Sequence, residues 1–520
     1  MTTDALIAGL QHAKAYDHPV KTITLVETHI SWVLLTGDVV YKVKKPVNFG
    51  FLDFSTLALR RHYCEEEVRL NRRYAAALYL GVVAVTGPLE APRINGSGPV
   101  LEYAVQMAQF DNSQLFSELL DAGRLEPARM DETAAVLAGF HAAIERAGAD
   151  SPFGSPAAVW QPVQENVAQL QEHAADFLAE GDARAGFDRI REWSEQAFAR
   201  LGPVLAQRKS DGFIRECHGD LHLRNVVLID GRVTPFDGIE FNANLRWIDV
   251  MSELAFLLMD LEDHGRRDLA RRLLNAYLQI SGDYAGLGVL RFYECYRAMV
   301  RAKVAALRRA QDAAARGECA QEIHNYLQLA EGYTRPTQPY LIITHGLSGA
   351  GKTTVTQALL EATDVIRVRS DVERKRLFEL PAAARTGAGV EAGIYGADAS
   401  TRTYLRLAQL AESILRAGWP VVVDATFIKQ EQRNQFRDLA RRLNVALIIL
   451  HCTVEANGQR RRILARETAG SDASEAGLAV LQHQLASQEP LTEEELATTM
   501  AIDTTDAIDI APLIEKVTSL

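Results

Sequence analysis

The stretch that most constrains the fold of this chain is a glycine-rich loop in its C-terminal third. Residues 346–353 read GLSGAGKT and satisfy the pattern G-x-x-x-x-G-K-[ST] in full. They follow the apolar run YLIITHG and precede a helical pattern, which predicts a strand, a phosphate-binding turn and a helix. Later apolar runs, PVVVDAT and VALIILHC, alternate with helical patterns, which predicts a parallel sheet covered by helices.

The polar side chains of this segment predict a site for a nucleotide and Mg²⁺. We expect Lys352 to reach the β and γ phosphates, Thr353 to offer its hydroxyl to Mg²⁺, and Asp424, at the end of PVVVDAT, to act on the same ion. The predicted nucleotide contacts are Gly346, Ser348, Gly349, Ala350, Gly351, Lys352, Thr353 and Thr354. A chance match is the alternative, and the strand–loop–helix context argues against it.

The order of features after the loop resembles that of the P-loop kinases. The loop is followed by Asp-x-x-Arg (Asp371 to Arg374), by the strand end DAT, and by the arginine-rich stretch NGQRRRILARE. Most of 339–520 is similar in this way to the gluconate-kinase, zeta-toxin and polynucleotide-kinase relatives. The resemblance implies that Asp371 accepts the proton of the acceptor hydroxyl and that Arg374 holds substrate or phosphate.

Two of these assignments leave alternatives open. Asp371 could instead cap a helix and Arg374 could be a solvated helix charge, although Ser370 is also able to supply the cap. We take Arg460 as the arginine that closes over the phosphates. Three more arginines compete on the same helical stretch: Arg461, Arg462 and Arg466.

A second phosphate-handling motif lies near the middle of the chain. HGDLHLRN places Asn225 five residues after Asp220, as in the kinase catalytic loop H-x-D-x-x-x-x-N, and PFDGIEF supplies Asp237 at the end of a short apolar strand. We expect Asp220 to orient and deprotonate a hydroxyl, and Asn225 and Asp237 to hold the metal ion. We interpret His218 and His222 as packing or hydrogen-bonding residues.

A lysine and a glutamate upstream of this motif are expected to complete the second phosphate-handling site. The strand-like text from 22 to 45 contains the turn signal TGD, which predicts a β-hairpin, and its run VVYK places Lys42 to reach the phosphates. Because strand side chains alternate with a period of two, Lys44 lies on the same face and competes for this role. The helical pattern of 60–77 offers Glu67, preferred here over Glu66, as the ion-pair partner.

HGDxxxxN with a downstream FD, a β-rich segment before it and no glycine triplet ahead of Lys42 resembles the aminoglycoside phosphotransferase family. The resemblance spans about 22–333 and implies a eukaryotic-kinase-like fold that phosphorylates hydroxyls of small molecules. Members act on choline, homoserine, sugars and amino sugars, so the substrate is not fixed. Coincidence and a degenerate, non-transferring kinase are the alternatives. We expect Asp249 to tie the catalytic loop together rather than to do chemistry.

These segments predict a multi-domain α/β chain, as its 520 residues also suggest. The fold class is a bilobal protein-kinase-like (α+β) domain followed by a P-loop NTPase domain with a parallel sheet covered by helices. The predicted ranges are 1–105 for the β-rich lobe, 106–332 for the helical lobe, 333–338 for a linker in EGYTRPTQPYL, and 339–520 for the P-loop kinase domain.

Composition narrows the class of protein further. A hydrophobic content of 48% and a charged content of 24% are typical of soluble globular proteins, and the net charge of −11 argues against a nucleic-acid-binding surface. The five cysteines are scattered, the N-terminus lacks a secretory pattern, and the apolar runs are too short to span a bilayer. We therefore expect a cytoplasmic protein without membrane partners; its oligomeric state is not predicted.

The sequence as a whole predicts an ATP- and Mg²⁺-dependent phosphotransferase with two separate nucleotide sites. Its expected partners are small molecules that carry hydroxyl groups. Two alternatives stay open. One domain could be catalytic while the other binds ATP for regulation, or the C-terminal domain could be a polynucleotide 5′-hydroxyl kinase.

Overall fold

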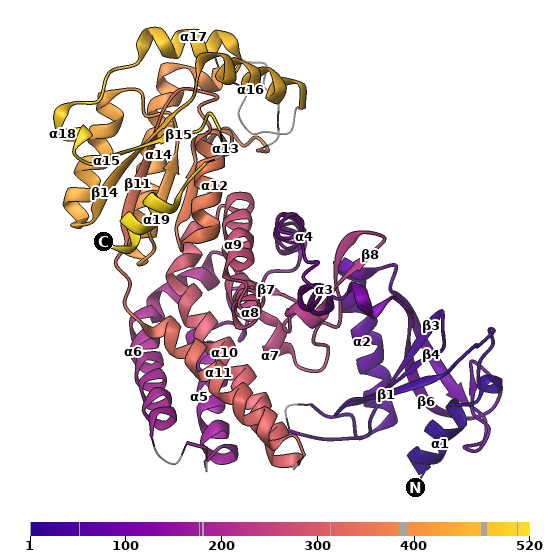
Figure 1. The fold of residues 1–520 in the computed structure, drawn as a ribbon. Helices are drawn as coiled ribbons and strands as arrows, with labels where there is room; N and C mark the ends of the chain where they lie inside the picture. The colour runs from indigo at the N-terminus through magenta and orange to yellow at the C-terminus, as the bar shows by residue number, and fades with distance from the viewer. Residues whose placement is uncertain are drawn as a thin grey trace. The chain divides into compact units, whose positions relative to one another are not determined.

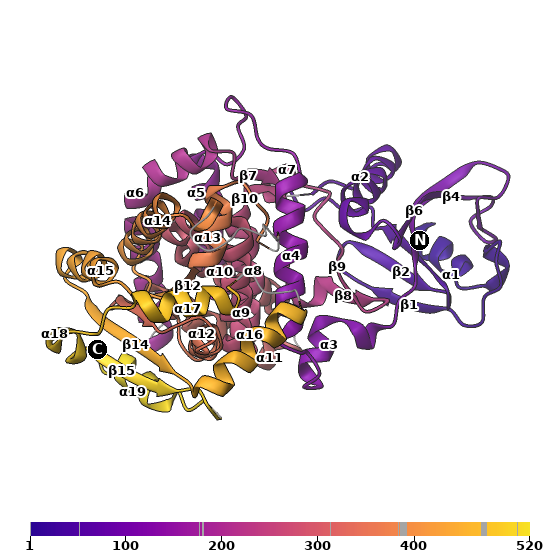
Figure 2. The same ribbon diagram turned by 90° about the horizontal axis from the view of Figure 1, so that it is seen from above.

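The computed structural model of the chain divides into two compact units, Met1–Asp263 with Phe292–Ala330 and His264–Arg291 with Glu331–Leu520 (Figures 1 and 2). It describes residues 2–50, 52–175, 177–178, 181–312, 314–382, 384, 393–469, 476–506 and 508–520.

The first unit begins with a six-stranded antiparallel sheet in the order β1-β2-β3-β6-β4-β5. Its strands are β1 (Thr24–Glu27), β2 (Ser31–Leu35), β3 (Val39–Lys44), β4 (Tyr79–Thr86), β5 (Arg93–Ile94) and β6 (Val100–Ala108). Strands β2 and β3 pair through the predicted hairpin, with Leu35 opposite Val40. The β-rich lobe expected from the sequence is therefore present.

Helices cover both faces of this sheet. Successive side chains of a strand point to opposite faces, so each face has apolar side chains that pack against a helix. Tyr41 and Val43 of β3 pack with α1 (Thr2–Leu10), whereas Val40 packs with α2 (Leu57–Ala75). Lys42 and Lys44 share the face of Val40 and therefore point toward α2. This alternation brings both lysines to the helix that carries Glu67.

The rest of the first unit is mainly helical. Its longer helices are α3 (Phe116–Asp121), α4 (Ala128–Ala143), α5 (Pro156–His173), α6 (Asp182–Ser210), α8 (Val250–Asp263) and most of α10 (Leu287–Gln311) and α11 (Arg316–Thr334). Two short antiparallel pairs interrupt them: β7 (Ile214–Glu216) with β10 (Trp247–Asp249), and β8 (Val226–Ile229) with β9 (Arg232–Pro235). The HGDLHLRN motif lies between β7 and β8, and Asp237 follows β9.

The second unit contains the predicted parallel sheet, in the order β12-β13-β11-β14-β15. The strands are β11 (Tyr340–His345), β12 (Ile366–Arg369), β13 (Val421–Asp424), β14 (Ala446–Thr453) and β15 (Thr499–Asp503). The helices are α12 (Lys352–Ala362), α13 (Ser370–Leu377), α14 (Ala397–Arg416), α15 (Gln430–Leu443), α16 (Ala456–Ala469), α17 (Leu478–Ser487), α18 (Glu493–Leu496) and α19 (Ala511–Thr518). The glycine-rich loop joins β11 to α12, as predicted.

The compact units differ from the predicted ranges at residues 264–291, which include α9 (Arg267–Ser281) and belong to the second unit. Strand β12 is an edge strand, and the Asn275 side chain of α9 pairs with its backbone. The Asn275 amide oxygen accepts from the Arg367 N–H (2.7 Å), and its amide nitrogen donates to the Val365 carbonyl (3.3 Å). The expected linker is also shorter at its start, because α11 continues to Thr334.

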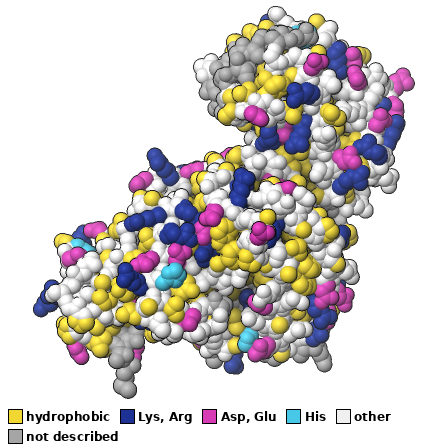
Figure 3. All heavy atoms as spheres, turned by 180° about the vertical axis from the view of Figure 1, so that it is seen from behind, with side chains coloured by type: hydrophobic (Ala, Val, Ile, Leu, Met, Phe, Trp, Pro, Cys, Tyr) yellow, Lys and Arg dark blue, Asp and Glu magenta, His cyan; other side chains and the backbone are white. Residues whose placement is uncertain are grey.

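None of the described helices is long and apolar enough to cross a membrane. On the face shown in Figure 3, acidic and basic side chains are interspersed rather than gathered by sign.

The role of Asn275 at the sheet edge is testable by Asn275→Ala. The variant leaves the Arg367 N–H and the Val365 carbonyl without this partner, and we expect a loss of about 1–3 kcal/mol in the free energy of unfolding. Urea denaturation measures the loss, and faster amide exchange at Arg367 locates it. Asn112→Ala, at an exposed position of the first unit, is the control and should change stability by less than about 0.5 kcal/mol. Unchanged exchange at Arg367 would contradict this role.

Candidate active sites

The first site is organised around Glu67 of α2. Its Oε1 accepts from Lys42 Nζ (2.9 Å) and its Oε2 from Lys44 Nζ (2.6 Å), while Lys42 Nζ also contacts Asp237 Oδ1 (2.5 Å). Glu66 instead pairs with Arg69 (2.9 Å). The structure therefore places Glu67, and not Glu66, beside the predicted lysine, and it brings both lysines to the same carboxylate.

Both members of the pair between Lys42 and Glu67 are charged. Burial raises the pKa of Glu67, but the charges of Lys42 and Lys44 lower it by more, to about 2. Burial lowers the pKa of Lys42, but the charges of Asp237 and Glu67 hold it well above its usual value. A lysine held in this way is a fixed cation, suited to phosphate oxygens.

The catalytic-loop motif folds so that Asn225 supports Asp220. The Asn225 amide nitrogen donates to the backbone carbonyl (2.9 Å) and to Oδ2 (3.2 Å) of Asp220. Burial raises the pKa of Asp220, but the charge and hydrogen bond of His222, 3.4 Å away, lower it by more. The Asp220 side chain is 40% exposed and ionised at neutral pH, so it can accept a hydrogen bond from a hydroxyl.

His218 has a structural role, in line with its interpretation from the sequence. Its Nε2 lies 2.8 Å from the Phe236 carbonyl, and its ring stacks on Tyr74 at 5.4 Å between centroids. Burial lowers the pKa of His218, which favours the neutral ring.

Asp237 is held in an unusual backbone conformation directly after β9. Its φ is +63°, a left-handed value that costs free energy for a residue other than glycine. Its N–H donates to the Tyr79 hydroxyl (3.0 Å), and the next N–H, of Gly238, donates to Asn71 Oδ1 (2.8 Å). These bonds hold the strained turn and leave the Asp237 side chain 42% exposed.

The donor set here fits Mg²⁺. Asn225 uses its amide nitrogen for Asp220, so its amide oxygen is the end left for a metal ion. The Asp237 carboxylate would supply the second oxygen ligand. Mg²⁺ prefers oxygen ligands and is commonly held by one or two side chains together with substrate phosphates. Asn225 and Asp237 are therefore the residues that would hold it.

Gly219 occupies the position where the kinase motif has arginine, and the local geometry requires glycine. Its φ is +88°, and a Cβ built there would lie 2.7 Å from the Leu245 carbonyl oxygen. A larger residue would displace either the loop or the segment that contains Leu245.

Three buried residues that the sequence did not indicate hold this loop. Glu253 of α8 accepts from the backbone N–H groups of His218 (3.1 Å) and Gly219 (2.7 Å). Asp260 accepts from the Leu223 N–H (2.8 Å), and Arg297 of α10 donates to the Gly219 carbonyl (3.2 Å). Each of them is more than 30 residues from the loop residue that it contacts, which leaves no local signal in the sequence.

Asp249, which was expected to tie the catalytic loop together, has its hydrogen-bond partners outside the HGDLHLRN motif. Its carboxylate pairs with Arg208, with distances of 2.6 and 2.8 Å, and accepts from the Met251 N–H (2.9 Å). Glu253, one helical turn further along, contacts the loop backbone instead.

The second site lies at the carboxyl ends of β11, β12 and β13. Thr353 Oγ1 donates to Asp424 Oδ2 (2.8 Å), so the two predicted Mg²⁺ ligands meet. Lys352 Nζ donates to the carbonyls of Gly346 (2.9 Å) and Leu347 (2.8 Å) within the loop. A hydroxyl beside a buried carboxylate again offers oxygen ligands, and these two residues would hold the ion.

Gly351 shows why the loop needs glycine. Its φ is +79°, and a Cβ there would lie 2.7 Å from Thr504 Oγ1. Only glycine therefore fits at this position, between the loop and the segment that contains Thr504.

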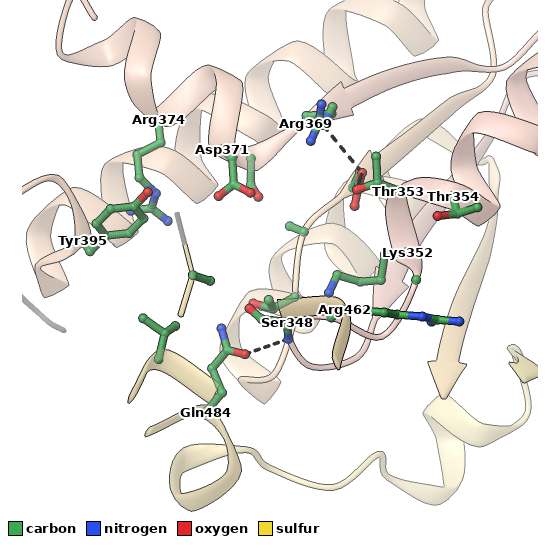
Figure 4. A pocket seen from close by; sticks show the side chains of 18 of the residues that line it. Ser348, Lys352, Thr353, Thr354, Arg369, Asp371, Arg374, Tyr395, Arg462 and Gln484 are labelled. Atoms are coloured by element: carbon green, nitrogen blue, oxygen red, sulfur yellow. Dashed lines mark hydrogen bonds and ion pairs between the residues drawn. The ribbon is translucent and has the colours of Figure 1, made fainter. Parts of the chain in front are cut away.

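A cavity of about 420 Å³ opens beside this loop (Figure 4). Of the predicted residues, it is lined by Ser348, Gly349, Gly351, Lys352, Thr353, Thr354, Asp371, Arg374 and Asp424. Gly346 and Ala350 belong to the loop but do not line the cavity.

Asp371 and Arg374 extend from α13 toward the same cavity. The helix begins at Ser370 with Arg369 at its N-cap position, so Asp371 is not the cap. Arg374 is buried, donates to the Ile394 carbonyl (2.9 Å) and lies over the Tyr395 ring at 5.2 Å. Neither residue is a solvated helix charge, and both face the phosphate loop across the cavity (Figure 4).

Of the arginines expected to close over the phosphates, the structure places Arg462 at the cavity and not Arg460, the one chosen from the sequence. Arg462 lines the cavity and donates to Thr504 Oγ1 (2.8 Å), whereas Arg460 is exposed and does not line it. The side chain of Arg466 lies outside the described residues. Two glutamines that the sequence did not indicate hold Ser348: its N–H donates to Gln484 Oε1 (2.9 Å) and its carbonyl accepts from Gln459 Nε2 (2.7 Å).

The support that Glu253 gives to the first site is testable through pH. Burial raises the pKa of Glu253, but the His141 hydrogen bond and charge and the Gly219 N–H lower it by more, from 4.5 to about 2. Glu253 thus stabilises the fold above its unfolded pKa, by about 3 kcal/mol, and this contribution is lost as pH falls through the folded value. Glu253→Gln should lose about that amount at pH 7, and the difference from wild type should shrink between about pH 5 and pH 2.

Denaturant unfolding across this pH range measures the difference. Glu126→Gln, at an exposed position, is the control and should follow the wild-type curve. A Glu253→Gln difference that stays constant with pH would show that the carboxylate charge does not stabilise the loop.

The chain is similar to a described protein family and to several solved kinase structures. Residues 341–491 match the model of a family described as an AAA domain. The solved structures that the chain is similar to include an ethanolamine kinase from Plasmodium vivax (10% identity, 61% of this chain and 82% of that chain, TM-score 0.39). Another is a gluconokinase from Sinorhizobium meliloti 1021 (20% identity, 35% of this chain and 91% of that chain, TM-score 0.24).

A full-length relationship is also found. The chain is 31% identical over 460 residues to "Uncharacterized protein Rv2004c" of Mycobacterium tuberculosis (strain H37Rv), a match that covers 88% of this chain and 89% of the relative. The AAA-domain match supports the predicted P-loop kinase domain at the C-terminus. Because the alignment spans most of both chains, this protein belongs to the same family as the mycobacterial protein.

Proposed function

We propose that the chain is an ATP- and Mg²⁺-dependent phosphotransferase with two separate nucleotide sites, each transferring the γ-phosphoryl group to a hydroxyl of a small molecule. The N-terminal acceptor would be a sugar, amino sugar or amino alcohol, and the C-terminal acceptor a small metabolite. ATP supplies the phosphoryl group and Mg²⁺ offsets charge on its phosphates.

At the first site, Asp220 would receive the acceptor hydroxyl. Its carboxylate is ionised and oriented by Asn225, which suits it to hold the hydroxyl in line and take its proton. Lys42, fixed by Glu67, would contact the phosphates. Asn225 and Asp237 would hold the metal ion.

At the second site, the backbone of the glycine-rich loop and Lys352 would cradle the phosphates, with Thr353 and Asp424 at the metal ion. Asp371 faces the loop across the cavity, where it would accept the proton of the second hydroxyl. Arg374 and Arg462 line the same cavity and would neutralise charge on the transferred group.

The observation that carries the proposal is that each site has its own cation and its own carboxylates. In separate compact units, Lys42 lies against Glu67 and Asp237, and Lys352 lies in the glycine-rich loop next to Thr353, which contacts Asp424. A regulatory nucleotide site would need the cation but no carboxylate to accept the proton of an acceptor hydroxyl, and the proposal gives that role to Asp220 and Asp371.

The proposal is tested by ATP turnover on a panel of hydroxylated metabolites and aminoglycosides, with products identified by mass spectrometry. Asp220→Ala removes the proposed base of the first site. Lys352→Ala removes the phosphate-binding lysine of the second site. We expect each variant to lose at least about 100-fold in the rate of one product and to retain the other.

Asp121→Ala and Lys516→Ala, both at exposed positions, are the matched controls and should retain both activities. If either active-site variant abolishes every phosphorylated product, two independent sites are excluded. If the wild-type protein only hydrolyses ATP slowly across the panel, phosphotransfer to these acceptors is excluded. The alternative that the chain binds ATP for regulation is then favoured. Phosphorylation of a nucleic-acid 5′-hydroxyl that is lost in Lys352→Ala would assign the second site to polynucleotides.

A further inference from the structure

The first site contains a second lysine whose contacts exceed what phosphate binding requires. Lys44 lies two residues after Lys42 on the same face of β3, and the two amines take the two oxygens of one carboxylate. The Glu67 carboxylate therefore bridges the two lysines instead of pairing with Lys42 alone. Lys44 is 1% exposed, so it is not placed to meet a ligand from solvent.

Lys44 has a second carboxylate partner, Glu240, which is 5% exposed. Glu240 lies three residues after Asp237, in the segment PFDGIEF. The Phe54 ring covers the Lys44 amine at 4.9 Å from its centroid. Buried charges are costly unless they are paired, so the ion pairs of Lys44 hold β3, α2 and this segment in one arrangement.

These contacts close a ring. Asp237 contacts Lys42, Lys42 contacts Glu67, Glu67 contacts Lys44, and Lys44 contacts Glu240, which returns to Asp237 along the chain. The ring contains three carboxylates and two amines, and burial raises the pKa of Glu240 within it. The most exposed member of the ring is Asp237, at 42%, so its carboxylate is the one that a cation from solvent can reach.

We infer that Lys44 and Glu240 are positioning residues for the metal–nucleotide site of the first unit. They fix Glu67 and the segment 237–240 independently of Lys42, so that Lys42 and Asp237 are released from a structural role and can serve ligands. The inference rests on the proposed function, since it concerns the nucleotide site assigned there.

The test uses the full chain with Lys352→Ala, which removes the phosphate cation of the second site. Into it we introduce Lys44→Met, Glu240→Gln, and both together. Two quantities are measured: the denaturation midpoint, and the Mg²⁺ concentration that gives half-maximal binding of a non-hydrolysable ATP analogue. Neither needs turnover or a known acceptor.

Each single variant leaves a buried charge with a lost partner, so we expect both to lower the denaturation midpoint. The double variant removes both charges and should recover most of that loss. Its Mg²⁺ requirement, however, should stay raised by at least about tenfold, because Glu67 is no longer bridged and the segment 237–240 is no longer held. This split between stability and Mg²⁺ dependence is what a positioning role predicts.

The neighbouring pair Lys45–Glu27, 2.6 Å apart with Glu27 63% exposed, supplies the matched control. Lys45→Met with Glu27→Gln should change neither quantity. If the Lys44/Glu240 double variant does not fold, Glu240→Asp keeps the charge but draws it back by one methylene, and a several-fold higher Mg²⁺ requirement is expected.

A wild-type Mg²⁺ requirement in the double variant, or in Glu240→Asp if the double does not fold, overturns the inference and leaves Lys44 and Glu240 a purely structural role. Loss of analogue binding in the Lys352→Ala parent would overturn the proposed nucleotide site as well. Intact, Mg²⁺-dependent binding without any phosphorylated product would contradict the proposed phosphotransfer alone.

Discussion

Holding the phosphates of a nucleotide requires positive charge whose position does not depend on the ligand, and the two proposed sites would meet this constraint differently. In the first, side chains do it: Glu67, fully buried, fixes the amine of Lys42. In the second, the proposed cradle is the glycine-rich loop at the start of α12 together with Lys352, whose amine donates to the loop carbonyls. The residues proposed for the metal ion lie beside each arrangement, Asn225 with Asp237 and Thr353 with Asp424.

The parts of these sites that were predictable from the sequence are those encoded locally. The loop GLSGAGKT and the HGDLHLRN motif carry their chemistry in fixed spacings, because a turn or a short helix sets the geometry over a few residues. The hairpin of β2 and β3 was predictable from its turn and its alternation. The choice between Lys42 and Lys44 was not, since a period of two places both on one face, and the fold uses both.

What the sequence did not indicate comes from contacts between distant segments. Glu253, Asp260 and Arg297 hold the catalytic loop from helices whose packing no spacing specifies. Arg462 was distinguished from Arg460 only by which face of α16 meets the cavity. The position of α9 was also not predictable from the sequence. This helix lies between helices of the first unit in sequence, but it contacts the edge of the parallel sheet through Asn275. A chain cut at 333–338 would therefore separate that sheet from a helix that covers its edge strand.

The central claim is that one chain carries two complete nucleotide sites, and binding stoichiometry tests it most directly. Equilibrium binding of a non-hydrolysable ATP analogue with Mg²⁺ should saturate at two molecules per wild-type chain, and at one when Lys352 is replaced by alanine. Saturation at one molecule in the wild-type protein would contradict the account.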